Sequence, residues 1–489
     1  MIYRDTLRLW TSKNLAPLMF LSAYFLTVVV GNIIFTTPFG KAQLEKLSYT
    51  AAIFEFDTLF SAGYWALLLV PFLVTPIVVT LVRRALERPL QKTANRFPEF
   101  SKTGYAVITA ACFGYVFFAL LKADAFTLFS SGADALSAVE ARFLIRNRAG
   151  AAAMIILMSV LPFLSVYSLI RWMRRDGVFW IAMSVSNTVI MTVFLTVLNM
   201  KWPVLVFDIG LVLAVFVYAQ RRPYLKAAIG SVMLIAVYLL ISTFVWRIAA
   251  PALAPAESPR AAKTETASIL TTTTSTLTSN SSSPYIVRLA EAAMQSAPML
   301  AIAAVNRMAV AYPYYFEVFS TEGAVCGGIL EQARVGPACR PSTFIYTRIF
   351  GDDGFQGRGT TPAAVHISGY ALGGWPVAIF ALICASIILG LFACLPLDMN
   401  ATIGALAITG GIAGYHFSQV PGEGPLIYDH GVLWVFLTLF LYIMCCWIYD
   451  KSKVIQVAGN TTVLHMGYRE HVLIKEETAA QRQDRKLRD

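Results

Sequence analysis

Arginine side chains occur at positions where they could bind phosphate oxygens. Arg142 and Arg146 are four residues apart and would share one face of a helix. Arg307 precedes a run of aromatic residues, and Arg358 lies in the glycine-rich segment GDDGFQGRGTTP. A planar guanidinium group binds two phosphate oxygens at once, so these arginines suit a diphosphate. The alternative interpretation is that they extend toward lipid headgroups.

Groups that could accept a proton follow these arginines in the chain. His366 comes after the glycine-rich segment, and Glu423 and His430 lie in the later loop PGEGPLIYDH. An imidazole or a carboxylate is typical of a general base, and we favour His366 over Glu423 for that role. The other interpretation is that His366 only donates a hydrogen bond that orients its loop. His430 is a candidate for substrate binding.

Tyrosines follow Arg307 in the segment YPYYFE. Tyr314 and Tyr315 beside a cation could stack on a sugar ring, which makes them candidate substrate-binding residues. The alternative is an aromatic belt at the membrane interface.

The cysteines divide into two groups. Cys326 and Cys339 lie in a loop that we expect outside the cell membrane, where an oxidising compartment would permit a disulfide, and we predict one. Neither has a further cysteine or histidine at zinc-site spacing, so we expect no metal and no cofactor. The other five lie in or beside apolar segments, as small buried hydrophobic residues do.

The elements that carry these residues are apolar. Of the 489 residues, 57% are hydrophobic and only 14% are charged, which favours an all-α integral membrane protein over a soluble one. A membrane-crossing helix needs about 20 apolar residues, and about ten segments qualify. They are 15–35, 59–82, 104–121, 150–170, 178–198, 202–219, 226–247, 371–395, 401–419 and 430–449.

Basic residues give the expected orientation. Arginine and lysine gather in the loops after the second, fourth and sixth segments and at both termini, so both termini are expected in the cytoplasm. The net charge of +11 is then a consequence of topology and anionic lipid, and no nucleic-acid partner is expected. This divides the chain into transmembrane helices 1–7 (1–249), an outer, periplasmic loop (250–370) with a flexible Ser/Thr-rich tether (251–284), helices 8–10 (371–450) and a basic cytoplasmic tail (451–489). Residues 285–320 are expected to form helices on the membrane, and 321–362 an irregular loop.

Signatures of soluble enzymes are missing from the sequence. It has no P-loop, no nucleophile-elbow serine, no HExxH and no cytoplasmic DxD that would hold the metal of a nucleotide sugar. Chemistry is therefore expected on the outer side.

The segment at about 300–395 resembles the bacterial oligosaccharide repeat-unit polymerases, the O-antigen polymerase family. The likeness consists of Asn306-Arg307 with its tyrosines, then Gly359-Thr360-Thr361-Pro362, Gly369-Tyr370 and Gly373-Gly374-Trp375-Pro376 before an apolar helix, together with the late position of the large outer loop. Two departures from the family are the Ser/Thr-rich stretch at 264–283 and Ala363, where a second proline is expected.

The resemblance implies a metal-independent glycosyltransferase in a bacterial inner membrane. The donor is a glycan on polyprenyl (undecaprenyl) diphosphate, and the acceptor is a sugar hydroxyl of another lipid-linked unit in exopolysaccharide or O-antigen synthesis. The expected partners are this lipid-linked oligosaccharide, membrane lipids, and a chain-length regulator and a flippase. The alternatives are an O-antigen ligase with the same donor, or a non-enzymatic polysaccharide or lipid transporter. A transporter is expected to have charged residues inside its apolar segments, and Asp208 is the one that we find.

Overall fold

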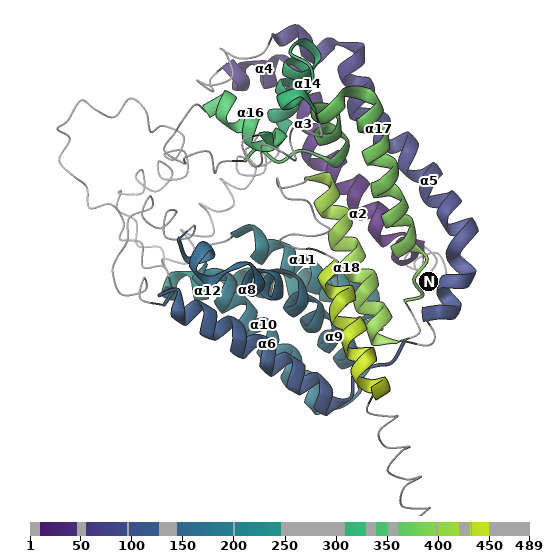
Figure 1. Ribbon diagram of the computed structural model, residues 1–489, viewed down its shortest axis with the longest axis vertical. Coiled ribbons are helices and arrows are strands. Elements are labelled where there is room, and N and C mark those ends of the chain that lie inside the picture. Colours follow the sequence, from purple (N-terminus) through teal and green to yellow (C-terminus); the bar gives the residue numbers. More distant parts are fainter. Residues whose placement is uncertain are drawn as a thin grey trace, which may run out of the picture. The chain divides into compact units, whose positions relative to one another are not determined.

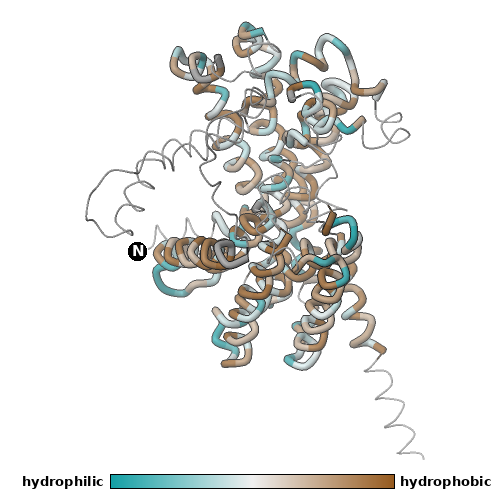
Figure 2. Tube along the Cα trace, turned by 90° about the vertical axis from the view of Figure 1, so that its left-hand side faces the viewer, coloured by the Kyte–Doolittle hydropathy of each residue, from teal (hydrophilic) through white to brown (hydrophobic). Residues whose placement is uncertain are grey.

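The computed structural model describes the chain as a set of α-helices (Figure 1). The described residues are 10–45, 55–94, 97–126, 144–198, 201–245, 309–328, 339–350, 360–397, 400–419, 431 and 433–448. No β-strand occurs within these ranges. Hydrophobic residues predominate along the helices, and hydrophilic residues lie mainly near their ends and in the turns (Figure 2).

Seven of the described helices are long and apolar enough to cross a membrane. They are Leu15–Phe35 (α2 and α3, joined by a π-helical turn), Ala62–Ala94 (α5), Lys102–Lys122 (α6), Ala151–Met173 (α8 and α9), Val178–Val197 (α10), Pro223–Ile241 (within α12, Pro223–Val245) and Val365–Ala393 (α17). The shorter apolar helices are Trp202–Tyr218, within α11 (Lys201–Tyr218), and Leu433–Ile448. An all-α, multi-pass membrane protein is therefore confirmed. All ten expected segments overlap helices, while the number that cross the membrane and their orientation stay predictions.

Helix α18 (Ala401–Ser418) is the most enclosed of the described helices. All its residues except Thr409 are buried, and it contacts α2, α9, α11 and α17. Its glycines make this possible: a Cβ atom at Gly414 would overlap the peptide oxygen of Ala16 in α2. Small residues that let two backbones approach closely are typical of helix pairs in membranes.

An ionic cluster lies at the N-terminus of α18. The Glu99 carboxylate accepts hydrogen bonds from Arg171 at 2.6 Å, from Arg174 at 2.9 Å and from the backbone N–H of Ala401 at 2.7 Å. Asn400 caps the same helix by accepting from the N–H of Ile403 at 2.8 Å. A carboxylate at a helix N-terminus is stabilised by the exposed N–H groups there, so this cluster fixes the end of α9 against the start of α18.

Helix α17 begins at Val365, six residues before the expected start, and is sharply bent. Gly373 has φ −178° and Gly374 has φ +68°, a left-handed value that favours glycine. A Cβ atom at Gly369 would lie 2.8 Å from the peptide oxygen of Val377. Eight residues of straight helix would span about 12 Å. The segment 365–372 therefore folds back against the long part of α17.

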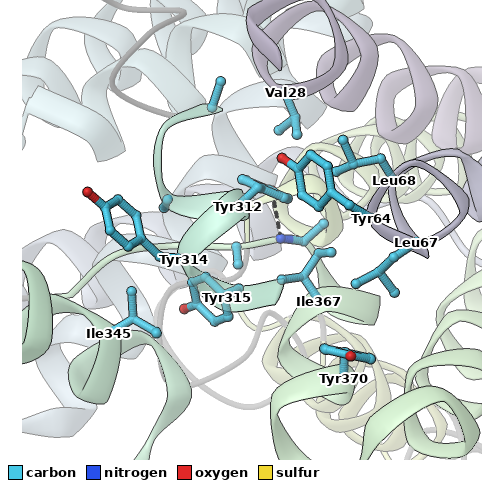
Figure 3. Close-up of a cluster of buried hydrophobic side chains, with 14 of the residues drawn as sticks. Val28, Tyr64, Leu67, Leu68, Tyr312, Tyr314, Tyr315, Ile345, Ile367 and Tyr370 are labelled. Atoms are coloured by element: carbon cyan, nitrogen blue, oxygen red, sulfur yellow. Dashed lines mark hydrogen bonds between the residues drawn. The ribbon is translucent and has the colours of Figure 1, made fainter. Parts of the chain in front are cut away.

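The expected outer loop contributes to the core. Helices α14 (Ala311–Thr321) and α16 (Pro341–Phe350) pack with the ends of α3, α5 and α17 in one hydrophobic cluster (Figure 3). The expectation of irregular structure over 321–362 is wrong for 341–350. Pro341 begins a helix there, as proline often does at a first helical position, and Ile345 and Ile349 on one face are buried.

The last described helix, Leu433–Ile448, lies in a second unit of the chain. Its large apolar side chains are mostly exposed, as suits a helix surrounded by lipid.

Candidate functional site

His366 lies in the first turn of α17, on the segment that folds back. A general base needs access to its substrate, yet the exposed fraction of His366 in this structure is 0%. The close approach at Gly369 carries the histidine into the protein, among residues of α2 and α5.

The His366 ring interacts with two other apolar helices. Its Nε2 lies 3.3 Å from the hydroxyl of Tyr24 in α2, and the two rings meet edge to face at 5.2 Å between centroids. The ring also interacts with the backbone of Leu67 in α5. Nδ1 makes no hydrogen bond of standard geometry to any described group. The ring thus brings α2, α5 and α17 together.

Tyr312 of α14 makes hydrogen bonds to two other parts of the chain. Its hydroxyl accepts a hydrogen bond from the N–H of Ala364 at 2.9 Å (Figure 3) and donates to the carbonyl oxygen of Ser418 at 3.4 Å. Burial raises the pKa of Tyr312 above its usual value of about 10, so the hydroxyl stays protonated and able to donate. Tyr312 therefore ties the start of α17 to the end of α18.

Asn32 is a buried polar residue inside the first apolar helix. Its carbonyl oxygen accepts from the hydroxyl of Tyr64 at 2.6 Å, and its amide donates to the carbonyl oxygens of Val28 at 2.9 Å and of Ala309 at 3.4 Å. These bonds satisfy the amide, which explains how an asparagine is tolerated at 0% exposure.

Tyr314 and Tyr315, which the sequence suggested as sugar-stacking residues, are 1% and 0% exposed. The Tyr315 hydroxyl donates to the carbonyl oxygen of Thr361 at 2.9 Å, and burial raises its pKa above the usual value. Neither ring is open to a ligand in this conformation. Tyr315 instead holds the segment that leads into α17.

Cys326 and Cys339 are joined by a disulfide, with their Cα atoms 5.8 Å apart. Close by in the chain, Arg348 of α16 forms a surface ion pair with Glu322. The two links close the segment between α14 and α16.

The cationic part of the expected site is mostly outside the described residues. Arg142, Arg307 and Arg358 lie there, as do Glu423 and His430. Arg146 is described: it is half-buried in the helical residues 144–149, close in sequence to Arg148, which pairs with Asp124 at 3.3 Å. That these four arginines bind a diphosphate together stays a prediction.

Sequence reasoning missed Tyr24, Tyr64 and Asn32. The available signal was the presence of polar groups inside apolar segments, since such groups must find partners in lipid. Their hydrogen-bond partners lie in distant parts of the chain, so the sequence alone could not show which groups pair.

The described part of the arrangement is a network of neutral hydrogen-bonding groups. It suits the fixing of backbone segments where α2, α5, α14, α17 and α18 meet. The described residues include no group of three or more His, Cys, Asp or Glu side chains that could hold a metal ion. No family model, no curated protein and no solved structure matches this chain.

Proposed function

We propose that this protein polymerises lipid-linked oligosaccharide repeat units at the outer face of a bacterial inner membrane. A sugar hydroxyl of one unit attacks the anomeric carbon of a second unit, a new glycosidic bond forms, and polyprenyl diphosphate leaves with the electron pair of the broken bond. The proposal rests on the resemblance of residues 300–395 to the O-antigen polymerases.

The observation that supports it is the common core of the late loop and the apolar helices. Helices α14 and α16 and the start of α17 pack with α3 and α5 rather than forming a separate domain. A polyprenyl-linked substrate requires such a junction, because its tail stays among apolar helices while its diphosphate and sugars need polar groups at the helix ends.

The arginines would stabilise the leaving group. Negative charge develops on the diphosphate as the bond breaks, and fixed cations lower the energy of that transition state without a metal. Arg142, Arg146, Arg307 and Arg358 have this role in the proposal. The proton of the attacking hydroxyl passes to a general base, for which the sequence offers His366 and Glu423.

The test is chain extension by the purified protein in liposomes with lipid-linked repeat units. Wild type should give a ladder of products, and Arg307→Lys and Arg358→Lys should each lower the rate by at least about tenfold, because lysine keeps the charge without the two-pronged guanidinium. Arg348→Lys is the matched control, since Arg348 pairs with Glu322 on the surface. A wild type that extends nothing, or lysine variants as fast as the control, would reject the proposal.

The related ligase reaction uses the same donor, and a deletion strain separates the two. Loss of long chains with single units retained supports a polymerase. Loss of all attachment to the lipid A–core acceptor supports a ligase and contradicts a polymerase.

A further inference from the structure

The surroundings of His366 favour one of the two neutral tautomers of its ring. A tyrosine hydroxyl can donate or accept, and in the favoured tautomer Tyr24 donates to Nε2 across the 3.3 Å between them. The proton of the neutral ring is then on Nδ1, where it can point toward the peptide oxygen of Leu67. The other tautomer would place a bare Nδ1 lone pair against that oxygen, which is repulsive.

The sequence of α5 makes the Leu67 oxygen available. In an α-helix this oxygen would accept from the N–H four residues later, but that residue is Pro71, which has no N–H. Since Leu67 is buried and its oxygen lacks this usual helical donor, a donor from elsewhere is favoured. The folded-back start of α17 supplies His366.

Nε2 thus meets the Tyr24 hydroxyl, the ring interacts with the backbone of Leu67, and the exposed fraction of the ring is 0%. A general base must have a free lone pair within hydrogen-bond reach of the acceptor hydroxyl. The lone pair on Nε2 is occupied by Tyr24, and the ring has no face open to a substrate.

We propose that His366 is a positioning residue: as the neutral Nδ1–H tautomer it joins α2, α5 and α17 and fixes the segment that leads into the site, and it takes no proton from the acceptor. This inference rests on the proposed function only where it concerns the reaction. There the proton of the attacking hydroxyl passes to a base other than His366, for which the sequence offers the Glu423 carboxylate, as the carbon–oxygen bond forms and the diphosphate leaves.

Solid-state NMR tests the tautomer without any assay of activity. Protein labelled with ¹⁵N in its five histidine rings is placed in lipid bilayers, and the His366 signals are assigned as those that His366→Gln removes. We expect one neutral ring protonated on Nδ1. Pro71→Ala restores the N–H that competes for the Leu67 oxygen and should shift the Nδ1 signal. Pro76→Ala, in the same helix, is the matched control and should leave it unchanged. A ring protonated on Nε2, an even mixture of tautomers, or equal effects of the two proline variants would overturn the inference.

Amide replacements test the role in the reaction. Glutamine can accept the Tyr24 hydrogen bond and asparagine can donate in place of Nδ1, but neither takes up a proton. We expect at least one of His366→Gln and His366→Asn to keep turnover within about tenfold of wild type, whereas loss of a general base lowers it by about 10²–10⁴-fold. His366→Ala should lower both turnover and folded yield, while Glu423→Gln should be folded and inactive.

The inference is overturned if both amide variants fold normally yet are as inactive as His366→Ala. It is also overturned if Glu423→Gln keeps normal turnover. If wild type itself extends no chains, the proposed function fails, and the tautomer measurement still decides whether His366 occupies the junction as described.

Discussion

Among single residues, the hydroxyl of Tyr312 is the group whose removal has the clearest effect on stability. It accepts from the N–H of Ala364 and donates to the carbonyl oxygen of Ser418, and all of these groups are buried. Removing one partner of a buried hydrogen bond leaves the other unsatisfied, which costs about 1–3 kcal/mol. These two hydrogen bonds of the Tyr312 hydroxyl therefore stabilise the junction of α14, α17 and α18.

Tyr312→Phe should lower the free energy of unfolding by about 1–3 kcal/mol while the ring packing is kept. The measurement is the thermal unfolding midpoint of the purified protein in detergent. Tyr115→Phe is the control, because Tyr115 is 47% exposed on α6. Equal midpoints for the two variants would mean that the Tyr312 hydroxyl contributes no net stability.

The disulfide between Cys326 and Cys339 closes a loop with a sequence separation of 13. In the chain-entropy model such a loop stabilises the folded state by about 3 kcal/mol. Reduction, or Cys326→Ser with Cys339→Ser, should therefore lower the unfolding midpoint, and Cys112→Ser should not. Mass spectrometry of alkylated, non-reduced protein provides the direct check: two alkylated thiols at these positions would contradict the disulfide.

At the scale of elements, glycine determines how closely the helices pack. Gly414 brings the backbone of α18 against α2, and Gly369 brings the start of α17 against its own later turns. The apolar segments were predictable from sequence because hydropathy is a local property. The bend in α17 was not, because it depends on the contact of residues 365–372 with the rest of the helix. The burial of His366 could not be predicted either, because it depends on contact with Tyr24, which is 342 residues away in the chain.

Gly414→Ala should separate α2 from α18. The added methyl group would overlap the Ala16 peptide oxygen. Because the overlapping atom belongs to the backbone, no flexible side chain can move aside to make room. Overpacking of this kind costs about 1–3 kcal/mol or more. The control is Gly114→Ala in α6, where a Cβ atom meets nothing within 4 Å.

The control substitution should even stabilise the protein by about 0.5–1 kcal/mol, because alanine favours a helix over glycine. Opposite shifts in the unfolding midpoint are therefore expected for the same chemical change at two helical sites. Shifts of the same sign and size would contradict the close contact of α2 and α18.

At the scale of the whole molecule, α18 connects the ionic cluster of Glu99 to the tyrosine–histidine network. Its N-terminus is held by Glu99 and Asn400, and its last residue, Ser418, accepts from Tyr312. The sequence predicts that these two ends face opposite sides of the membrane, because basic loops gather at one of them. The candidate site could be assigned from sequence only as separate motifs. Their arrangement depends on long-range packing, and most of the arginines lie outside the described residues.

The topology can be tested by labelling cysteines in intact cells with a membrane-impermeant maleimide. The background lacks the five free cysteines and keeps the Cys326–Cys339 disulfide, which does not react. A cysteine at Thr321, exposed at the end of α14, or at Ser275 in the tether should be labelled from outside. A cysteine at Thr103, exposed at the start of α6 after the most basic loop, should be labelled only after lysis, because arginine- and lysine-rich loops stay in the cytoplasm. Labelling of Thr103→Cys in intact cells, with Thr321→Cys protected, would invert the topology and place the candidate site on the cytoplasmic side. A polymerase of translocated lipid-linked units could not work there.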